Sequence, residues 1–255
     1  MSLEIVTLAT LSDNYNFLIH DTETGQTALV DAPEDPNIAE ALKARGWGLD
    51  IILLTHHHWD HIDGASALRA EFGCKILGAE ADAHRLPELD IVVSPGESFE
   101  LFGRSVDVID VPGHTIGHVA FYLASENALF SADSLMALGC GRLFEGTPAQ
   151  MFASLSKLAA LPENTMVYSG HEYTAANAKF ALTIEPGNLA LKQRVEAIER
   201  ARNANNPTVP SRLSEELATN PFLRSASPEV QATVGLSGAE LVDVFTEVRR
   251  RKDNF

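Results

Sequence analysis

The sequence has little of three things that whole classes of protein require: cysteine, basic residues and long apolar runs. Cys74 and Cys140 are isolated and form no C-x-x-C pair, so a thiolate metal site of that kind is not expected and a reducing cytoplasm is the simplest location. Lys and Arg number 19 against 35 Asp and Glu, for a net charge of −16. Because phosphate groups are bound by cations, this balance argues against nucleic acid or anionic membrane as a partner.

No apolar run approaches the ~18 residues that a membrane span needs. Residues 1–5 contain neither a basic segment nor an apolar one, so we expect no signal peptide. Hydrophobic residues make up 45% and charged residues 21% of the 255 positions, which is ordinary for a globular protein. The length allows one large domain, or a main domain with an appendage.

Local patterns predict many short strands with a few helices in the first part of the chain. We expect strands at residues 3–8, 15–20, 26–30, 51–54, 75–77, 98–101, 106–111, 119–123, 128–131 and 166–169, and helices at 37–45, 64–72 and 148–161. Such a mixture predicts layered α/β packing. After residue 173, helical patterns at 174–182, 188–205, 211–218 and 238–252 predict a helical appendage of about 80 residues.

Four of the nine histidines lie within residues 55–61, Thr-His-His-His-Trp-Asp-His, directly after an apolar strand pattern. In an extended segment successive side chains alternate, so His56, His58 and Asp60 would point one way and His57 the other. The alternative is a polar loop with chance histidines, but so many histidines offer little to a core. The segment therefore predicts a ligand-binding loop.

His114, Asp133 and His171 each follow another predicted strand. Any one alone would be a surface residue or a hydrogen-bonded polar group, whereas all of them together with the histidine loop predict a metal centre. Imidazole and carboxylate ligands without thiolate suit zinc, our first choice, or iron or manganese. If Asp133 bridges two ions, one would be held by His56, His58 and His114, and the other by Asp60, His61 and His171. Two adjacent cations activate water, so the set is suited to hydrolysis.

Other histidines and one aspartate receive lesser roles. We expect His57 to orient or pack rather than to ligate, and His118 to have a structural or ligand-supporting role. His20 and His84 have no motif around them and are expected to be ordinary surface or turn residues. Asp31 is either a turn residue or an acceptor that orients the histidine loop.

The motif T-H-x-H-x-D-H with later His, Asp and His resembles the metallo-β-lactamase superfamily, whose fold is an αββα sandwich with a dinuclear site at one edge. The chain is closer to the glyoxalase II, or hydroxyacylglutathione hydrolase, family within it. The similar motifs are T-H-H-H-W-D-H at 55–61, P-G-H-T at 112–115, G-C-G-R at 139–142, E-G-T at 145–147, G-H-E-Y-T at 170–174, N-P-F-L-R at 220–224 and R-R-R-K-D at 249–253. They run over nearly the whole chain, including the helical appendage.

This resemblance implies a metallo-β-lactamase-like catalytic domain at residues 1–173 and a helical glutathione-binding domain at 174–255. It implies two divalent metal ions on the ligands given above, with Asp133 bridging, and places Asp60 and Asp133 in catalysis with a metal-bridging hydroxide. The family's glutathione positions fall on Arg142, Phe144, Tyr173, Arg249 and Lys252. Without the family, residues 249–252 would be interpreted as a solvated helix end stabilised by the helix dipole.

Two positions depart from the family pattern. Ala132 precedes Asp133 where the family usually has glycine, and Phe144 stands where a tyrosine usually contacts glutathione. Phenylalanine cannot donate that hydrogen bond, which would cost about tenfold in affinity at most. We therefore expect an altered KM rather than altered chemistry.

The activity implied by the resemblance is hydrolysis of S-D-lactoylglutathione to glutathione and D-lactate, the second step of methylglyoxal detoxification, by a cytoplasmic monomer. No serine or cysteine nucleophile is required, and Cys140 is expected to be a packing residue. The alternatives are a mononuclear-iron persulfide dioxygenase of the same superfamily, which would consume oxygen, and a non-catalytic metal-binding protein. A β-lactamase is disfavoured because no secretory signal is expected, and an RNA-processing nuclease because the chain is acidic.

Overall fold

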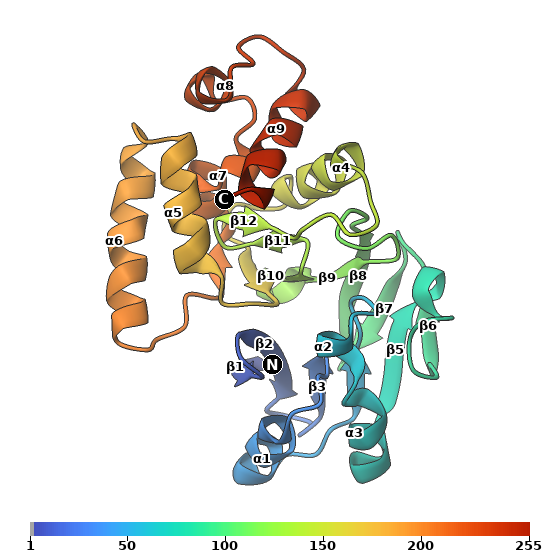
Figure 1. Cartoon of the computed structure of the whole chain (residues 1–255). Helices are drawn as coiled ribbons and strands as arrows, with labels where there is room; N and C mark the ends of the chain where they lie inside the picture. The colour runs from blue at the N-terminus through green and yellow to red at the C-terminus, as the bar shows by residue number, and fades with distance from the viewer. Residues whose placement is uncertain (1–2) are drawn as a thin grey trace. The chain divides into compact units, whose positions relative to one another are not determined.

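The computed structural model describes residues 3–255, which divide into two compact units. The first unit consists of Met1–Asp110 with Gly117–Ser131, and the second of Val111–Ile116 with Ala132–Phe255. Figure 1 shows both units with the chain coloured from blue at the N-terminus to red at the C-terminus. The chain passes between the units three times, so this division by packing differs from the domain boundary at residue 173, which stays a prediction.

The first unit begins with a six-stranded mixed sheet in the order β1-β2-β3-β4-β5-β6. Its strands are β1 (Leu3–Thr10), β2 (Asn14–Asp21), β3 (Thr27–Val30), β4 (Ile51–Leu53), β5 (Lys75–Ala79) and β6 (Ile91–Val93). The first three strands pair antiparallel, and β3 to β6 pair parallel. Parallel neighbours need long crossover connections. Here α1 (Pro36–Arg45) supplies the one between β3 and β4, and α2 (Trp59–Ile62) with α3 (Ala65–Phe72) the one between β4 and β5.

Helices α1 and α3 cover one face of this sheet (Figure 1). Ile38 and Leu42 of α1 are buried in one apolar cluster with Leu68 of α3 and with side chains of β2 to β5. The start of α1 is fixed by the Asp35 side chain, which accepts the Asn37 amide. The helix ends at Arg45, as predicted, and Gly46 after it has a φ of 69°, the left-handed conformation typical of a glycine C-cap.

A second sheet has six strands in the order β14-β13-β10-β9-β8-β7, and its strands in this unit pair antiparallel. Those strands are β7 (Ser98–Leu101), β8 (Arg104–Asp110), β9 (Val119–Leu123) and β10 (Ala128–Ala132), and short 3₁₀ turns η1 (Glu80–Asp82) and η2 (Ala124–Glu126) lie elsewhere in the unit. The rings of Phe17 on β2 and Phe130 on β10 are 5.8 Å apart, and the Arg104 guanidinium is 3.0 Å from the Asp21 carboxylate. The two sheets therefore pack face to face, with α1 and α3 as an outer layer.

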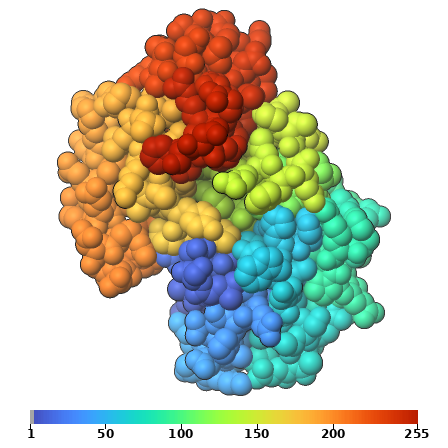
Figure 2. Space-filling model, viewed as in Figure 1, coloured from blue at the N-terminus to red at the C-terminus, as the bar shows by residue number. Residues whose placement is uncertain are grey.

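The second unit is mainly helical. It contains the two-stranded hairpin β11 (Leu135–Met136) with β12 (Gly139–Cys140), then α4 (Pro148–Ala159), β13 (Met166–Ser169), α5 (Thr174–Ile184), α6 (Leu189–Asn203), β14 (Ser211–Arg212), α7 (Leu213–Thr219), η3 (Pro221–Leu223), α8 (Pro228–Val234) and α9 (Leu241–Asp253). Helices α5 and α6 lie side by side (Figure 1). In the space-filling view they form the gold and orange surface of this unit, and α8 and α9 the red one (Figure 2).

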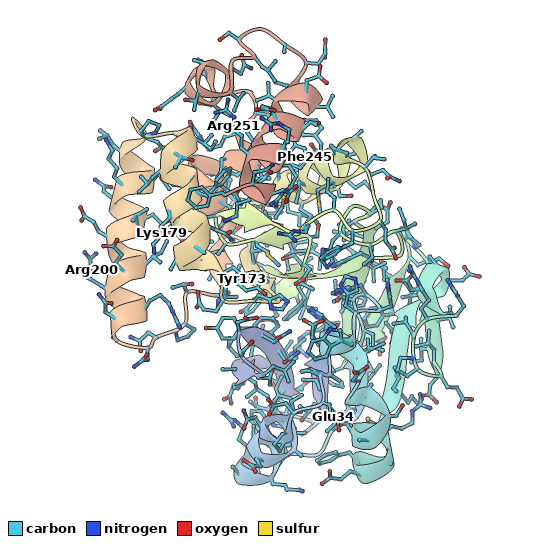
Figure 3. The ribbon with its side chains drawn as sticks, viewed as in Figure 1. Glu34, Tyr173, Lys179, Arg200, Phe245 and Arg251 are labelled. Atoms are coloured by element: carbon cyan, nitrogen blue, oxygen red, sulfur yellow. The ribbon has the colours of Figure 1, made fainter. Side chains whose placement is uncertain are left out.

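An aromatic cluster joins the helices of the second unit. Phe245 of α9, labelled in Figure 3, lies 5.8 Å from the Phe152 ring of α4 and 5.9 Å from the Phe222 ring of η3. Phe222 in turn stacks on Phe180 of α5 at 6.1 Å. Phe180, Phe222 and Phe245 are almost fully buried, and burying such rings is a large source of stability. The N-P-F-L-R motif thus supplies a core residue of the helical part.

Ala132, at the end of β10, has a φ of 41°. A side chain in this left-handed region costs ~1–2 kcal/mol relative to glycine. We therefore expect Ala132→Gly to raise the free energy of unfolding by up to ~1 kcal/mol, since the added freedom of glycine in the unfolded chain offsets part of the gain. Urea unfolding of the metal-free protein measures the change. Ala128→Gly is the control, because Ala128 has no positive φ and its replacement should destabilise; the same loss at Ala132 would rule out strain there.

Candidate metal centre

The histidine loop of the first unit leaves β4 in an extended course and then turns into the short helix α2. The Nε2 atom of His56 lies 3.1 Å from Nδ1 of His58. Asp60 and His61 belong to α2, and the His61 Nε2 is 3.6 Å from the Asp60 carboxylate. The expected extended course through Asp60 is therefore wrong, because α2 begins at Trp59, whose side chain is 65% exposed.

Asp31, at the end of β3, orients this loop. Its carboxylate accepts the Thr55 amide at 2.9 Å and the Thr55 hydroxyl at 2.9 Å, and its Oδ2 is 2.8 Å from Nδ1 of His61. Asp31 and His61 are both buried. A proton held on Nδ1 leaves the lone pair of the neutral His61 ring on Nε2, which is the usual arrangement for a histidine that binds a metal. Of the two roles expected for Asp31, the structure supports the orienting acceptor.

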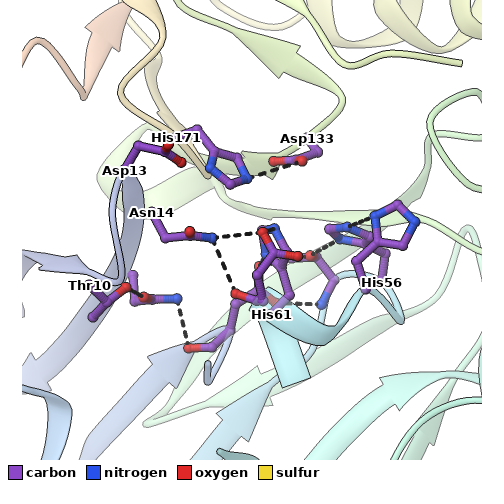
Figure 4. A network of polar contacts seen from close by, with 12 residues as sticks. Thr10, Asp13, Asn14, His56, His61, Asp133 and His171 are labelled. Carbon is purple, nitrogen blue, oxygen red and sulfur yellow. Dashed lines mark hydrogen bonds and ion pairs between the residues drawn. The ribbon is translucent and has the colours of Figure 1, made fainter. Parts of the chain in front are cut away.

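Asparagines from β2 support the same loop, and the sequence gives no local signal of their role. Asn14 Nδ2 donates to the Asp60 carbonyl at 3.2 Å and to its carboxylate at 3.0 Å (Figure 4). Asn16 Nδ2 donates to the Asp31 carbonyl at 3.1 Å, and Asn16 Oδ1 accepts from the Thr10 hydroxyl. The separations of 46 and 15 residues explain why sequence reasoning missed them.

Two neighbouring histidines, His57 and His118, are not among the candidate ligands. The Nδ1 of His57 is 3.2 Å from the Asp82 carboxylate and its Nε2 is 3.3 Å from the Arg85 guanidinium, so the ring is held by its own pair of partners, as expected of an orienting residue. His118 is buried and stacks on the His56 ring at 4.6 Å with an interplanar angle of 10°. This contact fixes the plane of His56, as expected of a supporting residue.

The prediction for His20 is wrong, whereas that for His84 is confirmed. His20 is a buried strand residue whose ring stacks on Trp47 at 3.9 Å and whose Nδ1 lies 2.9 Å from the Thr27 hydroxyl. Its burial depends on a tryptophan 27 residues away, which no local pattern reveals. His84 is exposed in a turn.

The second unit brings together His114, Asp133 and His171, all buried. The Asp133 Oδ2 atom lies 3.4 Å from Nε2 of His114 and 3.3 Å from Nε2 of His171; Figure 4 shows the contact with His171. The Nδ1 of His114 is 2.7 Å from the Arg142 carbonyl. A carbonyl only accepts, so Nδ1 carries a proton, and in the neutral ring the lone pair is then on Nε2, the atom that faces Asp133.

Gly141 explains why the G-C-G-R motif lies beside these residues. A Cβ at this position would lie 2.0 Å from the Asp133 carbonyl oxygen and 3.0 Å from Nδ1 of His114. In the same way a Cβ on Gly146 would meet the Gly113 backbone at 2.6 Å. Close backbone approach therefore requires glycine here, and the motifs around residues 113, 141 and 146 form one packed site.

Two exposed aromatic rings flank the second-unit histidines. Phe144 is 61% exposed and lies 5.3 Å from the His114 ring, while Tyr173 is 40% exposed and stacks on His171 at 4.8 Å. Tyr173 directly precedes α5 (Figure 3). Large rings exposed beside buried polar groups are typical of a ligand site.

The cations expected to bind glutathione lie in the same unit with unequal exposure. Arg142 is largely exposed, 3.8 Å from Asp253. Arg249 is buried and donates to the Cys140 carbonyl at 3.0 Å and to Asp253 at 2.7 Å. Asp253 thus joins the two arginines, a link that sequence reasoning missed.

Lys252 lies between aromatic rings, 5.2 Å from Phe180 and 5.4 Å from Phe255. Burial and the nearby Arg249 charge lower the pKa of Lys252. An anion bound beside Lys252 would oppose this lowering of the pKa, because it would stabilise the protonated amine.

Burial raises the pKa of Cys140 to about 11, despite the opposing Arg249 charge. Burial also raises the pKa of Cys74. Because the thiolate is the reactive form, we expect iodoacetamide to leave both cysteines of the native protein unmodified at pH 7 to 8. Mass spectrometry of native and urea-unfolded samples checks this. Rapid native labelling of Cys140 would contradict the packing role, whereas labelling only after unfolding supports it.

The donor set of both units suits a divalent metal. In the first unit, buried His56 and His61 have ligand atoms within 4.8 Å of each other and of the Asp31 carboxylate, which bonds Nδ1 of His61. Imidazoles whose second nitrogen is hydrogen-bonded, together with carboxylates, are what zinc, iron and manganese use. The groups of histidine and aspartate side chains in the structure are consistent with a binuclear metal site.

Comparison with known proteins covers the whole chain. Residues 12–171 match the model of the metallo-beta-lactamase superfamily, and residues 172–255 match that of the hydroxyacylglutathione hydrolase C-terminus. The hydroxyacylglutathione hydrolase of Ruegeria pomeroyi is 61% identical over 100% of both chains. That of Methylococcus capsulatus is 54% identical over 99% of both.

Solved structures agree on the fold. The BLEG-1 B3 metallo-beta-lactamase superimposes with a TM-score of 0.66 over 87% of this chain and 99% of its own, at 22% identity. ETHE1 from Myxococcus xanthus gives 0.60 over 89% and 99%, at 25% identity. Among residues 3–255, no helix is both long and apolar enough to span a membrane. The chain has the metallo-beta-lactamase fold with an added C-terminal helical region, and it belongs to the hydroxyacylglutathione hydrolase family.

Proposed function

We propose that the protein hydrolyses S-D-lactoylglutathione to glutathione and D-lactate, the second step of methylglyoxal detoxification, using two divalent metal ions. The observation that carries this proposal is 61% identity to a hydroxyacylglutathione hydrolase over the entire length of both chains. Substrate specificity in this superfamily depends on more than the fold. Similarity over the full length, including the C-terminal region, is therefore a stronger argument for the substrate than the shared fold.

The assignment of metal ligands rests on the resemblance of the sequence to the family. His56, His58 and His114 would hold one ion, Asp60, His61 and His171 the other, and Asp133 both. The hydrogen bonds on the remote nitrogens of His61 and His114 support Nε2 as the ligand atom in each. When bound, the ions would supply an activated water and polarise the thioester carbonyl. Zinc is our first choice, with iron or manganese as alternatives.

Glutathione would be bound by the residues that the sequence indicates: Arg142, Phe144, Tyr173, Arg249 and Lys252. Its carboxylates need cations, and in a chain with a net charge of −16 these must be gathered locally. The exposed rings of Phe144 and Tyr173 offer apolar contact area. In this proposal residues 1–173 form the catalytic domain and 174–255 the helical glutathione-binding domain. We also propose a cytoplasmic monomer, and two free, buried cysteines support a reducing compartment.

The test is loss of thioester absorbance when metal-replete protein meets S-D-lactoylglutathione, with and without a chelator. Rapid, chelator-sensitive hydrolysis is the expected result. Absence of turnover by protein that contains stoichiometric metal would overturn the proposal. Oxygen uptake with glutathione persulfide would then test the dioxygenase alternative.

Lys252→Ala should raise KM by about tenfold and leave kcat nearly unchanged, because it removes one charge-assisted contact to a substrate carboxylate. Steady-state kinetics over a wide substrate range separate the two constants. Lys179→Ala, on α5 and labelled in Figure 3, is a control cation of the same unit. An unchanged KM in Lys252→Ala, or a loss confined to kcat, would contradict the binding role.

A further inference from the structure

The hairpin β11–β12 connects two parts of the candidate metal centre in the second unit. Asp133 lies two residues before β11, and Arg142 two residues after β12. Both ends contact one ring: the Asp133 carboxylate is 3.4 Å from Nε2 of His114, and the Arg142 carbonyl is 2.7 Å from its Nδ1. The position of the hairpin therefore determines how His114 is held at both nitrogens.

The turn of this hairpin is strained. Leu138 has a φ of 55°, in the left-handed region that β-turn glycines usually occupy. Its side chain is fully buried among residues of α5 and α6, including Ala178, Leu191 and Ile198. A strained backbone persists only where its surroundings fix it, so the surroundings of residues 136–139 are informative.

Three buried side chains from the helical part bind the backbone of this turn. Asn220 Nδ2 donates to the Met136 carbonyl at 3.1 Å and to the Gly139 carbonyl at 3.0 Å. Glu216 accepts the Leu138 amide at 2.8 Å. Asn177 Nδ2 donates to the Ala137 carbonyl at 3.0 Å. Each of the four consecutive residues thus has a backbone polar group bound by a side chain from α5, α7 or the residue before η3.

Two of these three side chains, Asn220 and Glu216, are themselves held by further contacts. Asn220 and Glu216 are fully buried, and Asn220 Nδ2 is also 3.1 Å from the Glu216 carboxylate. Arg194 of α6 pairs with Glu216 and donates to the Thr219 hydroxyl at 2.7 Å. Asn220 Oδ1 accepts the Phe222 amide at 3.1 Å. A buried polar network in which every member is bonded is rigid and specifies one geometry.

We propose that Asn177, Glu216 and Asn220 form a clamp that holds the β11–β12 hairpin, and through it Asp133 and the Arg142 carbonyl, in position around His114. They are positioning residues, because they touch the hairpin backbone and no candidate ligand. This inference rests on the proposed function, in which Asp133 and His114 bind metal. It gives α5 and α7 a part in metal binding besides their part in the helical domain.

Asn220→Asp tests the clamp with minimal change of shape. The carboxylate can still accept the Phe222 amide, but it cannot donate to the two hairpin carbonyls. Asn188→Asp is the matched control, since Asn188 also caps a helix through Oδ1, accepting the Leu191 amide, and donates through Nδ2 to the Ala218 carbonyl, away from the hairpin. Asn177→Ala is a second, milder variant for the case in which Asn220→Asp does not fold.

The first measurement is amide hydrogen exchange of the metal-free proteins. We expect residues 134–141 to exchange about tenfold faster in Asn220→Asp and in Asn177→Ala, with little change in α8 and α9. Asn188→Asp should leave residues 134–141 protected. Equal acceleration throughout the second unit, or no acceleration at the hairpin, would overturn the clamp.

The second measurement is zinc affinity by competition with a chromophoric chelator. Clamp variants should bind zinc about 10- to 100-fold more weakly, as is typical when ligand-supporting groups are lost, whereas Asn188→Asp should bind like the wild type. Wild-type zinc affinity in both folded clamp variants would overturn the inference. Neither readout uses the thioester, so a wild-type protein that binds zinc without hydrolysing S-D-lactoylglutathione would refute the proposed function and leave the clamp standing.

Discussion

Asp133→Asn should abolish thioester hydrolysis and bound metal together. The substitution keeps the shape of the side chain, but it removes the negative charge and one acceptor oxygen. In the wild type a single buried carboxylate oxygen lies 3.3 to 3.4 Å from the Nε2 atoms of His114 and His171. A bridging ligand serves both ions of a two-metal site, so we expect its loss to weaken both. Metal analysis after gel filtration and the thioester assay measure the two losses.

Asp107→Asn is a control for the same chemical change on an exposed strand residue, whose carboxylate accepts the Ser98 hydroxyl at 2.7 Å. It should retain metal and activity. Full metal content in Asp133→Asn, with activity lost, would show that Asp133 acts on the substrate or on water without bridging. Retained activity would remove Asp133 from the mechanism altogether.

The candidate ligands His114, Asp133 and His171 stand out in the sequence because each follows a strand. His114 comes after β8, Asp133 after β10 and His171 after β13, so the strand pattern and the residue type together single them out. The local backbone at Asp60 could not be predicted in this way. Helix α2 has only four residues, which is too short for a helical period to appear in a sequence.

The supporting residues were beyond sequence reasoning for a different reason. Asn14 meets Asp60 across 46 residues, and Asn220 meets the β11–β12 hairpin across 81 to 84 residues. An asparagine has no pattern of its own, and its role depends on which backbone groups tertiary packing leaves to be bonded. For Arg249 a local sequence pattern exists, but it does not predict that the side chain is buried. A cluster of cations at a helix end is typical of a solvated terminus, yet packing of α9 buries this arginine against Cys140.

The two departures from the family pattern have different physical consequences. Ala132 takes a positive φ, so its cost falls on stability, and the Gly170 amide bonded to its carbonyl at 3.0 Å helps to hold it. Phe144 is exposed beside His114, so its effect falls on what the site binds. Neither residue changes a donor of the candidate metal centre, which is why we expect the chemistry to be retained.

Asp31→Asn should weaken metal binding by about 10- to 100-fold without unfolding the protein. The wild-type carboxylate accepts three times, from the Thr55 amide, the Thr55 hydroxyl and Nδ1 of His61. In Asp31→Asn, a side-chain oxygen that still accepts the Thr55 backbone N–H leaves the side-chain NH₂ group facing Nδ1 of His61. Nδ1 must then accept, the ring proton moves to Nε2, and the ligand lone pair is lost. Zinc titration measures the affinity, and excess metal should restore activity.

The opposite orientation of the new amide would lower stability and not zinc affinity. If its oxygen faces His61, its NH₂ group faces the Thr55 amide, and a buried backbone N–H is left without an acceptor. That outcome would lower stability while zinc affinity stays near the wild-type value, so Asp31 would then serve the backbone of the loop and not the tautomer of His61. Asp50→Asn separates the two cases, because Asp50 also accepts a backbone amide, that of Thr27 at 2.7 Å, but touches no histidine. Stability loss in both variants with zinc affinity reduced only in Asp31→Asn assigns the metal effect to the His61 ring.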